Sequence, residues 1–316
     1  MSAALDPRLI EKEIVRIRER ESNPYSSGTK TNLFTLLIFR GAPTDGDDPV
    51  ETTLQYLLGR RPARIITIQR SSADHTEASV SGRCYPDKRN RGVCFEEVRI
   101  DAGTDGLGSD PGAWMPIVLR DLPVFAWLPD ADVAPWEPTL RQAAGLVDKL
   151  VVDSSRLRLG DSVTETIAVL RELRRKTADI PLLADFAWRR GHVLREQSAR
   201  AFDPPDIRPL LDRVTRVRLF GGSTAEAALF FRWLEVRLGR ALAVEHAAVG
   251  PLTEGFKVDF FAGGKDPIEI GCTRGGCLSR GEEKGAYRFP TDGEILLAEV
   301  DSLARDTVFQ EVLADG

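Results

Sequence analysis

The sequence predicts an α/β protein with a mostly parallel or mixed N-terminal sheet flanked by helices, followed by an α+β C-terminal domain. Short apolar, β-branched runs alternate with segments of helical period between residues 33 and 153, which is typical of a parallel sheet covered on two sides. Between residues 241 and 289, short runs follow one another with short connections, which indicates antiparallel pairing. The chain has 316 residues, enough for two domains, and we expect them over residues 1–160 and 161–316.

Capping residues and β-branched runs locate the elements of the first half. Asp6 as N-cap and Pro7 at the first helical position predict a helix over residues 6–21. Two alternating runs, 78–84 and 93–101, flank the turn PDKRNRG and predict a hairpin at one edge of the sheet. Further strands are expected over 33–39, 63–69, 123–128 and 149–153, and further helices over 50–58, 114–119 and 136–146.

The second half opens with a long helix expected over residues 161–176. The segment 184–202 has the apolar spacing of a single helix, and the breaker DPPD follows it. A strand over 214–220 then leads to a helix over 225–238, which ends at a glycine. A closing helix is expected over residues 292–305.

The composition is that of an ordinary globular protein and excludes several classes of function. Hydrophobic residues make up 42% of the chain and charged residues 29%. The net charge of −5 argues against nucleic-acid binding, and no apolar run reaches the roughly 18 residues that a membrane span needs. The charged N-terminus does not resemble a secretory signal, and the chain has only four cysteines, so we expect a cytoplasmic protein.

The arginine-rich segment ADFAWRRGHVLREQSARAFD carries the densest group of candidate binding residues. Trp188 lies beside Arg189 and Arg190, and Arg195 follows five residues further on. Arginine and tryptophan are enriched among the residues that contribute most to binding at protein interfaces, so the segment indicates a partner-binding surface. Trp127, at the end of a predicted buried strand, fits either the same surface or the core.

Lys88, Arg89 and Arg91 form a compact positive cluster at the tip of the expected hairpin. A cluster of this size is typical of a solvated turn whose charge protects an edge strand. The same three side chains also suit contact with an acidic partner surface or with a phosphate group. The sequence leaves both interpretations open.

Sequence signatures of catalysis are missing. The chain holds no dinucleotide-binding or P-loop glycine motif, no zinc-protease motif and no nucleophile elbow. His75, His192 and His246 lie far apart in the sequence, and each has a structural explanation. We therefore expect no enzyme, no cofactor and no metal. The alternative is a sugar-phosphate sensor or enzyme in which the arginines beside Trp188 clamp a phosphate.

The four cysteines form two pairs that are close in sequence. Cys84 and Cys94 lie at matching distances from the hairpin turn, so we expect them to face each other, and Cys272 and Cys277 bracket TRGG in a similar way. Free buried thiols, redox-active pairs and a zinc site with four cysteines are all compatible with this arrangement. The spacings, with nine and four intervening residues, differ from those of zinc knuckles.

Six segments resemble one known family in their order and spacing: ARIITIQ, GRCYPDKRNRGVCFEEVRI, VLRDLPVFAWLPD, LVDKLVVDSS, ADFAWRRGHVLREQSARAFD and RWLEVRLG. Together they look like the glucose-6-phosphate dehydrogenase assembly protein family, OpcA. The resemblance covers about residues 33–240 and is weaker beyond them. It implies a protein without catalysis that binds glucose-6-phosphate dehydrogenase, promotes the oligomeric, active form of that enzyme and acts as its allosteric effector. It requires no cofactor and leaves the oligomeric state of this chain open.

Overall fold

The computed structural model describes residues 2–3, 6–22, 28–29, 32–41, 48–58, 60–86, 92–129, 134–157, 162–263, 266–273, 276–279, 282–283 and 288–314. The chain forms two compact units, and each unit contains pieces from distant parts of the sequence. The first comprises Met1–Leu157, Arg175–Ala184 and Asp292–Ala304, and the second comprises Arg158–Arg174, Asp185–Thr291 and Arg305–Gly316. Two independently folding domains with a boundary near residue 160 remain a prediction.

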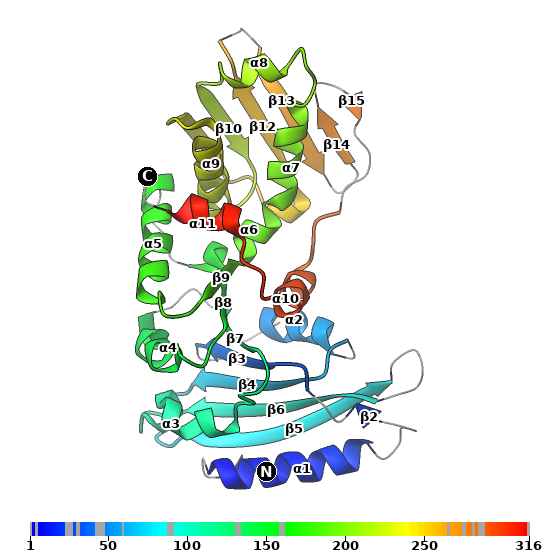
Figure 1. The fold of residues 1–316 in the computed structure, drawn as a ribbon, viewed down its shortest axis with the longest axis vertical. Coiled ribbons are helices and arrows are strands. Elements are labelled where there is room, and N and C mark those ends of the chain that lie inside the picture. Colours follow the sequence, from blue (N-terminus) through cyan, green and yellow to red (C-terminus); the bar gives the residue numbers. More distant parts are fainter. Residues whose placement is uncertain are drawn as a thin grey trace. The chain divides into compact units, whose positions relative to one another are not determined.

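A nine-stranded sheet forms the centre of the first unit (Figure 1). Its strands are β1 (Ser2–Ala3), β2 (Gly28–Thr29), β3 (Thr35–Arg40), β4 (Ala63–Arg70), β5 (Glu77–Pro86), β6 (Gly92–Ala102), β7 (Val124–Leu128), β8 (Lys149–Val152) and β9 (Leu182–Asp185). Their order is β1-β5-β6-β4-β3-β7-β8-β9, with β2 pairing β6 beside this path. Pairing is parallel from β6 through β4, β3 and β7 to β8, and antiparallel between β5 and β6. The predicted mostly parallel sheet with an edge hairpin is confirmed.

Helices cover both faces of this sheet. They are α1 (Pro7–Ser22), α2 (Pro49–Leu57), α3 (Pro111–Trp114), α4 (Glu137–Ala143) and α10 (Asp292–Val300). Short 3-10 turns span Leu107–Ser109, Met115–Ile117, Ala134–Trp136 and Ser154–Arg156. Aspartate side chains begin the first two helices: Asp6 accepts a hydrogen bond from the Arg8 amide at 2.9 Å, and Asp48 accepts one from the Val50 amide at 2.9 Å.

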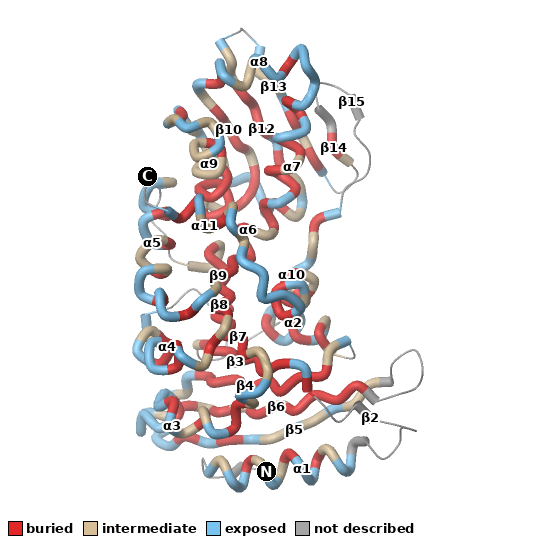
Figure 2. Tube along the Cα trace, viewed as in Figure 1, coloured by how far each residue is buried: buried red, intermediate tan, exposed pale blue. Residues whose placement is uncertain are grey.

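The central strands of the sheet are buried on both faces, as Figure 2 shows for β3, β4 and β7. Such strands consist of near-continuous apolar runs, which is why they could be located from sequence. Phe39 of β3 packs against Trp114 and Trp136, with ring centroids 5.8 and 5.4 Å apart. This aromatic cluster fixes the segments that follow β6 and β7 against the sheet.

A buried ionic network lies between α1 and the sheet. The guanidinium of Arg64 donates to Glu96 at 2.8 Å and to the carbonyl of Ile117 at 2.7 Å, and it also pairs with Glu11 of α1. Arg18 of α1 pairs with the same Glu96 carboxylate. The charged groups between α1 and the face of the sheet that it covers therefore have partners, and the apolar side of α1 packs on the strands.

A second buried ion pair joins β8 to α10. The side chains of Lys149 and Glu299 are 3% and 1% exposed, and the Lys149 Nζ lies 3.0 Å from a Glu299 carboxylate oxygen. The same ammonium donates to the Glu299 carbonyl at 3.0 Å and to the carbonyl of Ser302. Three acceptors therefore satisfy the three donors of a buried lysine. A residue of the central sheet is thus bonded to a segment 150 positions later in the chain.

The second unit is built on a six-stranded sheet. Its strands are β10 (Arg216–Phe220), β11 (Ala243–Ala247), β12 (Gly255–Phe261), β13 (Ile268–Thr273), β14 (Gly276–Ser279) and β15 (Glu282–Glu283). The order is β11-β10-β12-β13-β14-β15, and only the β10–β11 pair among these is parallel. The predicted α+β character of this half is confirmed.

Helices cover one face of the second sheet (Figure 1). The unit contains α5 (Val163–Lys176, as far as residue 174), α6 (Phe186–Arg190), α7 (His192–Ala201), α8 (Arg208–Leu211), α9 (Thr224–Leu238), a 3-10 turn over Leu252–Glu254 and α11 (Thr307–Leu313). Apolar residues of α7 and α9 pack against alternate residues of the strands, such as Val217, Leu219 and Val258. Gly239 ends α9 with a φ of 64°, as the sequence predicts.

Three helices predicted from the sequence are wrong in their extent. In place of the helix expected over 114–119, α3 ends at Trp114 and a 3-10 turn over Met115–Ile117 follows. The segment expected as one helix over 184–202 begins in β9, and it then continues as two short helices separated at Gly191. Asp185 is the cause, because its carboxylate accepts a hydrogen bond from the Ala187 amide at 2.8 Å and starts α6 after the strand. Likewise, the helix expected over 292–305 ends at Val300, and Asp306 caps the separate helix α11.

Among the described residues, no helix combines the length and the apolar character that crossing a bilayer requires.

The Lys149–Glu299 pair leads to a prediction about stability. We expect Lys149→Met to lower the free energy of unfolding by about 3–5 kcal/mol, because it leaves a buried carboxylate without a counter-ion. Urea denaturation followed by circular dichroism measures the change. Lys176→Met is the matched control: this lysine is 37% exposed and pairs with Glu137 at 2.7 Å, so about 0–1 kcal/mol is expected. Equal losses in the two variants would contradict the assignment.

Candidate functional site

The predicted binding residue Trp188 is buried inside the second unit. Its side chain lies in α6, is 2% exposed and stacks on Phe309 of α11 with ring centroids 5.3 Å apart. Its indole Nε1 donates to the Asp306 carboxylate at 2.8 Å. The tryptophan therefore joins α6 to the cap and first turn of α11, and both its apolar and its polar parts are satisfied internally.

Arg195 lies over the same indole ring. Its guanidinium carbon is 3.3 Å from the ring centroid of Trp188, and its Nη1 donates to the Trp188 carbonyl at 2.9 Å. Burial lowers the pKa of Arg195 to about 9, while the charge of Asp306 acts in the opposite direction. The side chain is still cationic at neutral pH, and it is held by the ring face, the carbonyl and the field of Asp306.

Arg190 has an equally specific internal partner. Its Nε donates to the Glu226 carboxylate at 2.8 Å, and both side chains are buried. Glu226 is also part of the capping box of α9, since its other oxygen accepts from the Ser223 amide at 2.8 Å while Ser223 Oγ accepts from the Glu226 amide. A single carboxylate thus starts α9 and neutralises a cation of α6.

Arg189 is the member of this group that reaches the surface. Its side chain is 40% exposed, and its guanidinium lies 3.8 Å from Asp306. The structure therefore brings Trp188, Arg189 and Arg195 together around Asp306. It does so mainly in the interior, whereas the sequence pattern suggested an exposed anchor surface. The reason is that acceptors for these cations come from residues 226 and 306, whose proximity no local pattern reveals.

The remaining predicted partner-binding residues lie elsewhere. Trp127 is buried in β7 of the first unit, which matches the core interpretation. Lys88, Arg89 and Arg91 lie outside the described residues. A role in partner binding for any of these residues remains a prediction.

The arrangement around α6 does not favour a phosphate clamp. Such a clamp needs several guanidinium groups whose donors converge on one open position. Here Arg190 is engaged by a buried carboxylate and Arg195 by an indole ring and a carbonyl. In addition, the N-terminus of α9 already carries the carboxylate of Glu226 in place of an external anion.

The cysteines pair as the hairpin patterns suggested. Cys84 and Cys94 lie directly opposite each other on β5 and β6, Cys272 and Cys277 do so on β13 and β14, and each pair forms a disulfide. The interpretation as free thiols is therefore wrong for this structure. Among the described residues, no group of three or more His, Cys, Asp or Glu side chains is placed to hold a metal ion. Redox regulation through either pair remains a prediction.

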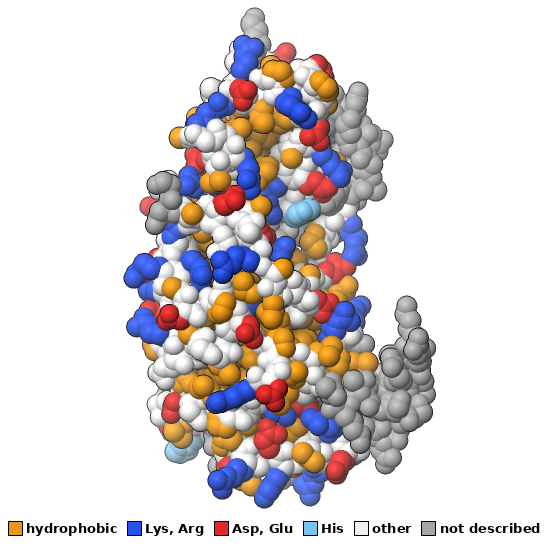
Figure 3. All heavy atoms as spheres, in the orientation of Figure 1, with side chains coloured by type: hydrophobic (Ala, Val, Ile, Leu, Met, Phe, Trp, Pro, Cys, Tyr) orange, Lys and Arg blue, Asp and Glu red, His pale blue; other side chains and the backbone are white. Residues whose placement is uncertain are grey.

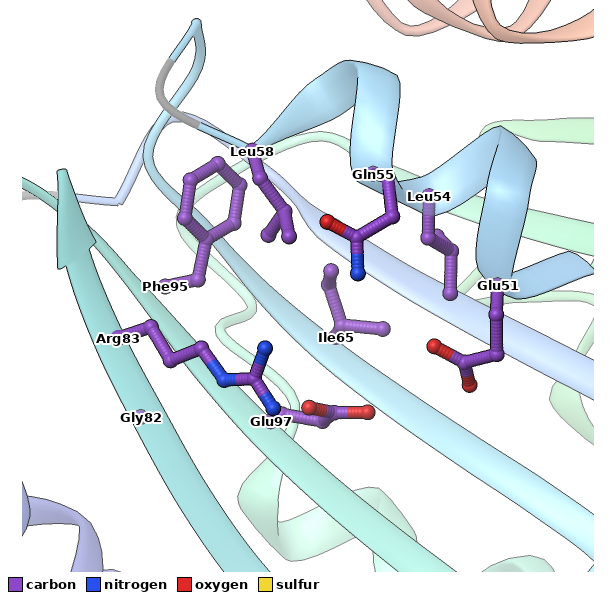
Figure 4. A pocket seen from close by; sticks show the side chains of 9 residues that line it. All are labelled: Glu51, Leu54, Gln55, Leu58, Ile65, Gly82, Arg83, Phe95 and Glu97. Carbon is purple, nitrogen blue, oxygen red and sulfur yellow. The ribbon is translucent and has the colours of Figure 1, made fainter.

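A pocket that the sequence analysis missed lies between α2 and the first sheet (Figure 4). It is shallow, with a volume of about 40 Å³, and is open to solvent. Its walls combine apolar side chains with four polar ones, as the close-up shows: Leu54, Leu58, Ile65 and Phe95, then Glu51, Gln55, Arg83 and Glu97. The pocket depends on the strand registers that pair Arg83 with Phe95 and Ile65 with Glu97. The sequence analysis located these strands but did not establish those registers, so it could not predict the pocket.

The polar groups of this pocket interact with one another and with the neighbouring residues Ser81 and Tyr85. Burial raises the pKa of Glu51, and the negative charges of Glu97 and Asp48 raise it further. Ser81 donates to Glu97 at 3.0 Å. The hydrogen bond and charge of Tyr85 raise the pKa of Arg83, and the charges of Glu97 and Glu51 add to this effect. The nine lining residues include no serine, threonine, cysteine, histidine or lysine, so they offer hydrogen bonds and charge rather than an activated nucleophile.

Comparison with known proteins decides the family. The model of the glucose-6-phosphate dehydrogenase subunit N-terminal domain matches residues 55–174, and that of the corresponding C-terminal domain matches residues 181–313.

The chain belongs to the OpcA family of glucose-6-phosphate dehydrogenase assembly proteins.

Two curated relatives carry the OpcA name. An OxPP cycle protein OpcA from Synechocystis sp. is 27% identical over 217 residues, which make up 66% of this chain and 43% of the relative. A protein of the same name from Nostoc punctiforme is 29% identical over 185 residues, 57% of this chain and 38% of the relative. The matched region spans less than half the length of either relative. The family resemblance inferred from the sequence motifs is confirmed.

The burial of Trp188 changes what its substitution should do. We expect Trp188→Ala to lower the free energy of unfolding by about 3–5 kcal/mol, because it leaves a cavity beside Phe309 and removes the support of Arg195. Trp188→Phe keeps a ring and loses only the hydrogen bond to Asp306, so about 1 kcal/mol is expected. Thermal and urea unfolding measure both. Arg189→Ala, at a half-exposed position, is the control and should cost no more than about 1 kcal/mol.

The strand registers predict the cysteine connectivity of the oxidised protein. Non-reducing peptide mapping by mass spectrometry should find Cys84 linked to Cys94 and Cys272 linked to Cys277, because each pair lies across one antiparallel ladder. In a Cys84→Ser variant, Cys94 should become alkylatable while the other link persists. A link between the two ladders would show that the registers are wrong.

Proposed function

We propose that this OpcA-family chain is a non-catalytic assembly factor and allosteric activator of glucose-6-phosphate dehydrogenase that acts by direct binding in the cytoplasm. One observation carries the proposal: the two models that together match most of the chain are named for subunit domains of that dehydrogenase. The OxPP cycle name of the curated relatives agrees with this partner.

Activation by docking needs only differential affinity. If the chain binds the assembled, active dehydrogenase more tightly than its other states, the population shifts toward the active form. A coupling free energy of roughly 1–3 kcal/mol alters the affinity of the dehydrogenase for its substrate by about 5–150-fold. Such coupling requires a complementary surface, and no chemistry within the effector itself.

The charges of the chain agree better with a protein partner than with a polyanion. On the face drawn in Figure 3, acidic and basic side chains are interspersed, and the net charge of the whole chain is −5. The predicted phosphate-clamping arginines are largely engaged internally, as described above. We therefore place the dehydrogenase, and neither nucleic acid nor a membrane, as the partner.

Among the residues predicted from sequence to bind the partner, Arg189 is the described one with substantial exposure. Trp188, Arg190 and Arg195 act in this proposal by holding α6, α9 and α11 together, which fixes the backbone that carries Arg189. Lys88, Arg89 and Arg91 of the hairpin tip are kept as candidate contacts on the strength of their sequence alone.

Mixing experiments with the cognate purified dehydrogenase test the proposal. We expect a stable complex in light scattering and a fall in the KM for glucose 6-phosphate, or a rise in oligomer mass, of the dehydrogenase. The chain alone should form no NADPH from glucose 6-phosphate and NADP⁺. Serum albumin at equal concentration controls for crowding. An unchanged mass together with unchanged kinetics would refute the proposal.

A further inference from the structure

The sheet of the second unit has one face that helices cover and one that they leave open. Alternate residues of β10 and β12, such as Val217, Leu219 and Val258, point toward α7 and α9 and are buried. Because side chains alternate along a strand, the intervening residues form the opposite face, which we call the outer face. Its charged members are Arg216, Arg218, Glu245, Lys257, Asp259 and Glu269.

Five of these six charged side chains are at least partly exposed, whereas that of Asp259, 3.2 Å from Lys257, is only 6% exposed. Arg216 is 42% exposed, Lys257 is 45% exposed and Glu269 is 53% exposed. Strands β11, β10, β12 and β13 each contribute at least one charged residue to it. The outer face therefore extends across four neighbouring strands, or about 15 Å.

Aromatic rings hold the cations of the outer face in place. The guanidinium of Arg216 lies 3.9 Å from the ring centroid of Phe261, and that of Arg218 lies 5.6 Å from the same ring. Arg218 and Lys257 lie 5.8 and 5.9 Å from the centroid of Phe220. Stacking on a ring leaves the N–H groups at the edge of a guanidinium directed sideways and restricts its motion, so binding a partner costs less conformational entropy.

Carboxylates complete an alternating pattern on the outer face. Glu245 of β11 accepts from Arg218 at 2.6 Å and lies 3.5 Å from Arg216. On the other side, Lys257 lies 3.0 Å from Glu269 and 3.2 Å from Asp259. Two cations face one carboxylate over β10 and β11, whereas one cation faces two carboxylates over β12 and β13. Over the described residues of β11, β10, β12 and β13 these charges cancel, but the two halves of this region carry opposite charge.

This charge pattern selects the kind of partner. Nucleic acid and anionic membranes attract surfaces of uniform positive charge, which the outer face is not. Arginine beside phenylalanine is instead the composition of protein interface centres. The two halves also require that acidic and basic groups be fixed about 10 Å apart on the partner, since β10 and β13 are two strand spacings apart. A folded protein surface meets that requirement.

We propose that the outer face is the surface through which this chain docks on glucose-6-phosphate dehydrogenase. The inference rests on the proposed function and adds the contact surface to it. The partner surface places an acidic group over Arg216 and Arg218 and a basic group over the exposed Glu269. At about 15 Å across, the outer face is the centre of an interface of standard size, and neighbouring surface completes it.

A matched pair of arginine variants tests the inference in the full chain. Arg218 is partly exposed and has one carboxylate at 2.6 Å, and Arg200 on α7, which packs on the other side of the sheet, is exposed and also has one carboxylate at 2.6 Å. We expect Arg218→Ala to raise the Kd for the dehydrogenase about tenfold or more, in the range of interface centres. Arg200→Ala should change it less than about twofold. Lys257→Glu should weaken binding as well.

The outcomes separate the two proposals. If the wild-type chain neither binds nor activates the dehydrogenase, the proposed function fails and the docking inference fails with it. If the wild-type chain binds while Arg218→Ala and Lys257→Glu bind equally well, only the docking inference is overturned. It is also overturned if these variants lose self-association and keep dehydrogenase binding, because a second copy then occupies the outer face.

Chemical labelling of the wild-type complex decides the matter if a variant fails to fold. Lys257 and Lys176 are 45% and 37% exposed, and each has a carboxylate partner within 3.0 Å. We expect added dehydrogenase to slow acetylation of Lys257 at least about threefold relative to Lys176. The inference is overturned if the dehydrogenase slows acetylation of both lysines equally. It is also overturned if a complex forms and the acetylation rate of Lys257 does not change.

Discussion

Burying a positive charge requires an acceptor, and this constraint shapes both units of the chain. In the first unit, the ammonium of Lys149 is satisfied only when α10 supplies a carboxylate and a carbonyl and Ser302, just after the helix, supplies a second carbonyl. In the second, Arg190 is satisfied by the carboxylate that also caps α9. Because each acceptor comes from far along the sequence, the interior is specified by long-range pairs rather than by local preference.

The same constraint explains which parts of the fold could be predicted. The parallel strands were located because they are continuous apolar runs, and the hairpin register because Cys84 and Cys94 are equally far from its turn. The extent of the helix around Trp188 was predicted wrongly, because Asp185 caps α6 after a strand and is not itself a helical residue. The function was predictable at the level of the family, from motifs in order, and not from any single site.

The candidate site shows why residue type alone did not locate a binding surface. Arginine next to tryptophan has the same appearance in the sequence whether the pair faces water or stacks in the interior. Here Asp306 accepts the indole hydrogen bond that allows Trp188 to be buried, and it lies 118 positions away in the sequence. The strand RVRLF appeared in the sequence only as a strand, yet its alternation places two arginines on the outer face of the sheet. Interior arginines maintain the scaffold, and exposed arginines stacked on phenylalanine remain available for recognition.

The order in which the two units are completed has a consequence for synthesis on the ribosome. Residues 292–304 belong to the first unit and provide α10, while residues from 305 onward belong to the second and provide the cap and helix that hold Trp188. Nascent chains usually fold one domain at a time from the N-terminus. Here the ammonium of Lys149 has no carboxylate partner until the ribosome has synthesised Glu299, and the indole of Trp188 has no partner until Asp306 has been added. Both units therefore close at nearly the same stage of synthesis, so a chain cut short before residue 292 would expose apolar surface from each.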